Sequence, residues 1–153
     1  MKQFMLFAVA LVTLTLFSCS DDDDNDSGSG SSITNTMVLR GQTYPIEIAL
    51  YFAHEDGQNG KFYNLDCDTK GGGLHGYGGF EGALVGKTTP LKGRFFLSFN
   101  PQSGPSIDPV IESGSVTIKQ VSDGLHILVD CKEEGGEKFT MNFLAKDEEK
   151  MRQ

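Results

Sequence analysis

Short runs of alternating apolar and polar residues limit the fold of this chain more than any other feature of its sequence. In residues 44–52 the large apolar side chains occupy every second position, so they are predicted to share the buried face of one strand. They are Tyr44, Ile46, Ile48, Leu50 and Phe52. Residues 125–131 alternate in the same way and are predicted to be a second half-buried strand.

Eight strands are predicted in total, at spacings near ten residues and without helices between them. They are residues 37–40, 44–52, 62–67, 82–85, 94–99, 115–121, 125–131 and 138–145. Turn residues separate them, and Ser122-Asp123-Gly124 is the clearest hairpin signal. Residues 146–153 are charged and helix-prone but too short to be more than a frayed tail. The pattern predicts an all-β fold: one antiparallel β-sandwich or a small β-barrel, with a calycin-like barrel as the alternative.

The first 18 residues have the composition of an export signal. Lys2 precedes 14 apolar or hydroxyl residues from Phe4 to Phe17, which is too short for a membrane span of about 20 residues. The sequence Leu16-Phe17-Ser18-Cys19 resembles the lipobox of bacterial lipoproteins. That resemblance implies removal of residues 1–18 and attachment of lipid to Cys19, which would hold the protein on a membrane.

Residues 19–32 follow as an acidic and Ser/Gly-rich segment with five Asp, predicted to be a disordered tether. Ser20 and the acidic run behind Cys19 resemble the signal by which lipoproteins of Bacteroidota reach the outer face of the outer membrane. The resemblance implies a lipid-anchored protein facing the cell exterior, with the periplasmic face as the alternative. Residues 33–146 are then the β-domain and residues 147–153 a charged tail.

The charge of the chain argues against nucleic acid as a partner. The 153 residues carry 21 Asp and Glu against 13 Lys and Arg, a net charge of −8, which would repel a phosphate backbone. Half of this acidity belongs to the first 32 residues, since residues 33–153 have a net charge of −4. A domain of that size buries a core large enough to fold without a metal or cofactor.

The order of motifs across residues 36–146 resembles small lipid-anchored β-domain proteins of gut Bacteroidota, whose function is largely unassigned. The motifs include Gly-x-x-Tyr-Pro-Ile from Gly41, Tyr-Asn-Leu-Asp from Tyr63, and Ser-Asp-Gly-Leu-His-Ile from Ser122. This resemblance implies a fold and a location but no activity.

Cys67 and Cys131 form an even pair once Cys19 is assigned to lipid. Both end a predicted strand on its apolar side. Two alternatives remain open at this point: a disulfide in an oxidising compartment, or two buried thiols that act as small apolar side chains.

Nucleotide and metal motifs are incomplete. The string from Gly71 to Gly76 matches G-x-G-x-x-G but opens no helix, and Gly86-Lys87-Thr88 lacks the first glycine of a P-loop. We therefore expect no nucleotide, and we interpret these glycines as bulges, bends and positions of positive φ. Asp66 and Asp68 begin like a calcium loop that is not completed, so no metal or cofactor is predicted.

No catalytic motif is readable, so an enzyme is not expected. His54, His75 and His126 lie in different elements, and His126 is interpreted as a solvated side chain on the polar side of its strand. A small enzyme or enzyme inhibitor would need His75 or His126 in a pocket within reach of a carboxylate. An apolar-ligand carrier is the third alternative. It would need a barrel whose interior cavity has a volume of roughly several hundred cubic ångströms, as is usual for ligand pockets.

Aromatic residues favour a binding or structural role. Phe95 and Phe96 are adjacent in a predicted strand, so one of them faces away from the first core layer. We expect either a second core layer or an exposed aromatic patch that binds a glycan or a protein. The residues proposed for this patch are Tyr77, Phe80 and either Phe95 or Phe96.

Overall fold

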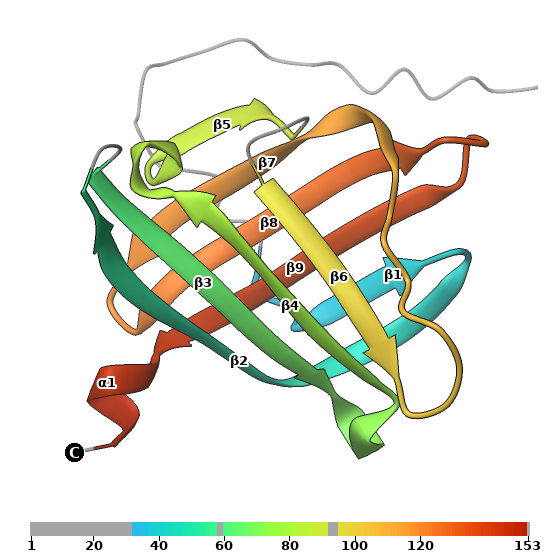
Figure 1. Ribbon diagram of the computed structural model, residues 1–153, viewed down its shortest axis with the longest axis horizontal. Coiled ribbons are helices and arrows are strands. Elements are labelled where there is room, and N and C mark those ends of the chain that lie inside the picture. The colour runs from blue at the N-terminus through green and yellow to red at the C-terminus, as the bar shows by residue number, and fades with distance from the viewer. Residues whose placement is uncertain (1–31, 58–59, 92–94, 153) are drawn as a thin grey trace, which may run out of the picture. The chain divides into compact units, whose positions relative to one another are not determined.

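The structure, a computed structural model, describes residues 32–57, 60–91 and 95–152. Nine strands form one sheet in the order β5-β7-β8-β9-β1-β2-β3-β4-β6. The sheet curls into a half-barrel, in which β2, β3, β4 and β6 cross over β7, β8 and β9 (Figure 1). This confirms the prediction of an all-β antiparallel domain. In the described part of the chain, the helices are too short or too polar to span a membrane.

Most neighbouring strands pair antiparallel, and β2 and β9 pair in parallel where Leu50 lies opposite Lys146. Elsewhere along these two strands, the short strand β1 lies between β9 and β2 and pairs with both. The strands are β1 (Thr36–Leu39), β2 (Gln42–Asp56), β3 (Gly60–Thr69), β4 (Leu74–Glu81), β5 (Lys87–Pro90), β6 (Phe95–Pro101), β7 (Ile111–Val121), β8 (Gly124–Glu133) and β9 (Lys138–Asp147). One helical turn, α1 (Glu148–Met151), follows β9.

One predicted strand was wrong, and two observed strands, β4 and β5, were missed. Residues 82–85 contain a 3₁₀ turn, Gly82–Leu84, instead of a strand. The strand β4 was missed because glycine interrupts its alternating pattern. The predicted hairpin is confirmed, since Ser122 and Asp123 connect β7 to β8 where Val121 pairs with Gly124.

The glycines of β4 make room for neighbouring side chains. A Cβ atom on Gly76 would lie 2.7 Å from the sulfur of Cys67 and 2.8 Å from the ring of Phe99. Positive φ was predicted for the glycines from Gly71 and for Gly86, and Gly71, Gly72 and Gly86 have it. Gly76, Gly78 and Gly79 do not, so the interpretation was wrong for the glycines of β4. Close approach of side chains is the physical reason for glycine here.

The inner side of the curled sheet is a packed core. Tyr63, Phe80 and Phe95 lie opposite one another on β3, β4 and β6, with ring centroids 5.0 Å and 5.9 Å apart. The ring of Phe99 meets that of Phe139 edge to face at 5.9 Å, which joins β6 to β9 across the interior. Side chains therefore fill the space that the half-barrel encloses.

A β-bulge changes which side of β2 faces this core. Ile46 pairs with Thr69, whereas Ile48 pairs with Asp68, so Glu47 is an extra residue. Beyond it Ala49 and Tyr51 point inward, and Ile48, Leu50 and Phe52 point outward. The prediction that all five large apolar residues of this strand share one buried face was wrong beyond Ile46, because the bulge shifts the alternation by one residue.

Candidate functional site

The outer side of β2, β3, β4 and β6 carries an unusual number of exposed aromatic rings. Tyr77 is 44% exposed, Phe96 52% and Phe52 40%. Together with Phe62 they form what we call the aromatic face. Phe52, on β2, and Phe96, on β6, lie in the same cross-strand row, three strand spacings or roughly 14 Å apart.

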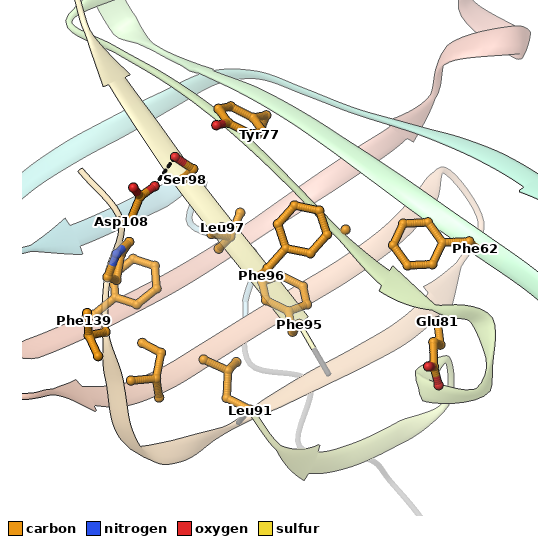
Figure 2. A pocket seen from close by; sticks show the side chains of 14 residues that line it. Phe62, Tyr77, Glu81, Leu91, Phe95, Phe96, Leu97, Ser98, Asp108 and Phe139 are labelled. Carbon is orange, nitrogen blue, oxygen red and sulfur yellow. Dashed lines mark hydrogen bonds between the residues drawn. The ribbon is translucent and has the colours of Figure 1, made fainter. Parts of the chain in front are cut away.

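The centre of the aromatic face is a glycine, which contributes no side chain to the surface. Gly79 lies between Asn64 and Phe96 in the cross-strand row. A Cβ atom on Gly79 would lie 2.7 Å from the ring of Phe62, so this ring covers the space that a side chain would occupy. Figure 2 shows the rings of Phe62, on β3, and Phe96, on β6, on either side of β4 at this point, with Tyr77 further along β4.

An open hollow of about 790 Å³ lies at one side of the aromatic face, along β6. We call it the edge hollow. It is lined by Phe62, Tyr77, Gly79, Glu81, Leu91, Phe95, Phe96, Leu97, Ser98, Asp108, Pro109, Val110, Ile111 and Phe139. Most of its side chains are apolar, and several are drawn in Figure 2.

The edge hollow begins where the segment beside β6 stops pairing with it. The backbone groups of Phe99 and Ile107 exchange two hydrogen bonds, of 2.9 and 2.7 Å. The same register would place Pro109 opposite Leu97, and proline has no N–H to donate. The hydroxyl of Ser98 donates to Asp108, which holds the segment at this point (Figure 2).

A second open hollow, of about 520 Å³, lies over β2, β3 and β4. We call it the central hollow. It is lined by Leu50, Tyr51, Phe52, Asn64, Leu65, Asp66, Tyr77, Gly78, Phe96 and Glu148. Tyr77 and Phe96 line both hollows and separate them, so these two rings are the centre of the candidate site.

One imidazole and two carboxylates lie next to the aromatic face. Nδ1 of His75 lies 2.8 Å from Asp68 and 3.5 Å from Asp66. The hydrogen bond with Asp68 raises the pKa of His75, and partial burial raises the pKa of Asp66. His75 lines neither hollow, so the geometry does not place a substrate against this pair. Among the described residues, no cluster of three His, Cys, Asp or Glu could hold a metal ion.

The residues predicted for an aromatic patch divide between the two sides of the sheet. Tyr77 and Phe96 lie on the aromatic face, whereas Phe80 and Phe95 are core residues with 0% and 6% exposure. Including Phe80 was wrong because it points inward from β4, whereas of Phe95 and Phe96 one was expected to face outward and Phe96 does. Sequence reasoning missed Phe52 and Phe62, and knowledge of the bulge would have been needed to place Phe52.

The two cysteines of the domain are free and buried. Cys67 lies on β3 and Cys131 on β8, where the Cys131 thiol contacts the carbonyl oxygen of Phe139 at 3.3 Å. The structure therefore contains the buried thiols and not the disulfide. Burial raises the pKa of each thiol to about 12. Cys19 lies outside the described residues.

His126 is not the solvated side chain that was predicted. It is 5% exposed, and its Nε2 lies 2.9 Å from the amide oxygen of Asn142 on β9. Asn142 in turn donates to the carbonyl of Ser32. His126 is therefore part of a packed contact on the other half of the sheet.

Comparison with protein-family models, with curated proteins and with solved structures finds no match to this chain. The geometry of the aromatic face is therefore the basis for assigning a function.

Proposed function

We propose that this protein is a lipid-anchored cell-envelope lipoprotein whose β-domain docks a partner protein through the aromatic face. The observation that supports this most is the group of large apolar side chains exposed on neighbouring strands. Ile48, Phe52, Tyr77 and Phe96 are each 40% to 52% exposed, and they belong to one side of one sheet. Aromatic residues surrounded by polar ones are typical of the centre of a protein interface.

A protein partner fits this face better than a glycan does. Sugars stack on aromatic rings, and Tyr77 and Phe96 could serve either kind of ligand. Ile48 and Leu50 extend the apolar surface along β2 with aliphatic side chains, which a protein partner would cover with its own apolar residues. The hollows on both sides of Tyr77 and Phe96 give such a partner two places to insert side chains.

Docking is tested by panning a library of random 12-residue peptides on the full chain in detergent. We expect selected peptides to bind at least tenfold more weakly to the Tyr77→Ala and Phe96→Ala variants, measured by fluorescence anisotropy. Ile33→Ala removes an apolar side chain that is 39% exposed and not among those lining either hollow, so it is the matched control. Equal binding to all four proteins would contradict the proposal, as would selective binding of glycans to the aromatic face.

The anchor is proposed from the residues around Cys19. We expect radioactive palmitate to label the protein in a bacterial host, and Cys19→Ser to abolish the label. Digestion of the protein by protease added to intact cells would support the outer face of the outer membrane. Protection of the protein in that assay would instead support the periplasmic face.

A further inference from the structure

The side of the sheet that carries the aromatic face is acidic. Its outward positions on β3 and β4 include Asp66, Asp68 and Glu81. Within the described residues 48–54, 62–68, 75–81 and 96–100 of this side, neither Lys nor Arg occurs, and the exposed Lys146 lies at its border, opposite Leu50 on β9. The surface that a partner would cover therefore combines exposed apolar rings with negative charge.

The central hollow brings this charge next to the rings. Asp66 lies between Leu50 and Tyr77 in its cross-strand row, and its side chain is 60% exposed. Glu148 reaches the same hollow from α1 and is paired with Arg152. A cation in this hollow would meet a carboxylate and aromatic side chains together.

The Asp66 carboxylate has little positive charge near it. Among the described residues, the ring of His75 is the base within 4 Å, and it lies closer to Asp68 than to Asp66. Burial, Asp68 and Glu148 raise the pKa of Asp66, and only His75 lowers it. A bound cation would offset this unfavourable environment.

We propose that the partner's docking segment is basic and places a Lys or Arg side chain in the central hollow. The charged group would pair with Asp66, and the methylene stem would pack on Tyr77 and Phe96. Long basic side chains combine these two contacts, because the stem is apolar and the charge interacts with aromatic faces and carboxylates. This inference rests on the proposed docking function and specifies the chemistry of its partner.

Charge complementarity favours a basic peptide segment over other ligands of the central hollow. A phosphate-rich or acidic partner would be repelled by Asp66 and its neighbours. A neutral apolar segment could cover the rings but would leave the carboxylate without a partner. An amine-bearing glycan would satisfy the carboxylate, and binding of chitosan oligosaccharides in place of peptides is therefore an outcome that overturns the inference.

The experiment uses the peptides selected on the full chain. We expect them to be enriched in Lys or Arg, and replacement of that residue by norleucine or citrulline to weaken binding at least tenfold. Asp66→Asn should weaken the basic peptide to a similar degree, with little further loss when both changes are combined. Glu137→Gln removes an exposed charge in the turn between β8 and β9 and should leave binding unchanged.

The outcomes separate the inference from the function on which it rests. Selected peptides without Lys or Arg that still depend on Tyr77 would overturn the basic partner and leave docking intact. Peptides whose binding is indifferent to Tyr77→Ala would overturn docking itself. A thermal unfolding curve for Asp66→Asn that matches the unsubstituted protein shows that any loss of binding is not a loss of fold.

Discussion

Glu133 places a carboxylate inside the domain at the end of β8. Its side chain is 6% exposed, and its Oε2 lies 3.7 Å from Nε of Arg40. Its other oxygen has no hydrogen-bond partner among the described residues. Arg40 lies in the turn between β1 and β2 with a φ of 49°, so this ion pair connects two strand ends that are far apart in the sequence.

We expect Arg40→Ala to lower the free energy of unfolding by about 1–3 kcal/mol, because it leaves a buried carboxylate without a cation. Urea unfolding followed by circular dichroism measures the change. In the Glu133→Gln variant, Arg40→Ala should lower the free energy of unfolding by a smaller amount, because the buried charge is already gone. Equal losses in both backgrounds would show that the ion pair does not stabilise the fold.

At the scale of the strand, the regular alternation of β8 allowed its buried side to be predicted, because no bulge interrupts it. Leu125, Ile127, Val129 and Cys131 are all buried, as their spacing indicates. The same reasoning assigned the wrong side to half of β2, where Glu47 is inserted. An alternating pattern cannot reveal a bulge when both sides of the strand carry apolar residues.

The candidate site was only half predictable for a related reason. The adjacent Phe95 and Phe96 showed that one ring must face outward, and the structure places Phe96 there. The orientation of Tyr77 depends on β4, a strand whose glycines conceal it from a search for alternation. The two hollows arise from contacts between distant strands, which one sequence does not display.

The glycines of β4 lead to a prediction about this strand. Gly76→Ala should destabilise the domain by about 1–3 kcal/mol, because the added methyl group would press against Cys67 and the ring of Phe99. Gly57→Ala is the matched control, since a Cβ atom there meets nothing within 4 Å. The two variants are compared by urea denaturation, and equal stabilities would contradict close packing at Gly76.

At the scale of the whole molecule, the two buried thiols make stability depend on alkaline pH. Burial raises the pKa of Cys67 and that of Cys131 from the ordinary thiol value of 9.0 to about 12. Below pH 9 the thiols are protonated in both the folded and the unfolded chain. Between pH 9 and 12 the unfolded chain releases protons that the folded chain retains, so the free energy of unfolding falls as the pH rises.

We therefore expect urea denaturation to show lower stability at pH 10 than at pH 8. The double variant Cys67→Ala/Cys131→Ala should be less stable at pH 8, because it loses buried volume, but its stability should decline less between the two pH values. The quantity to compare between the two proteins is the fall in the free energy of unfolding from pH 8 to pH 10. An equal decline in both proteins would show that ionisation of these thiols does not contribute.

The bulge at Glu47 affects how the outer side of β2 tolerates changes of length. Strict alternation through Glu47 would turn Ile48, Leu50 and Phe52 toward the core, but the bulge absorbs the extra residue and keeps them outside. Without Glu47, Ile48 would still follow Ile46 in register and face outward opposite Asp68. A homologue that is one residue shorter at this position would therefore keep the same apolar stripe on its outer side.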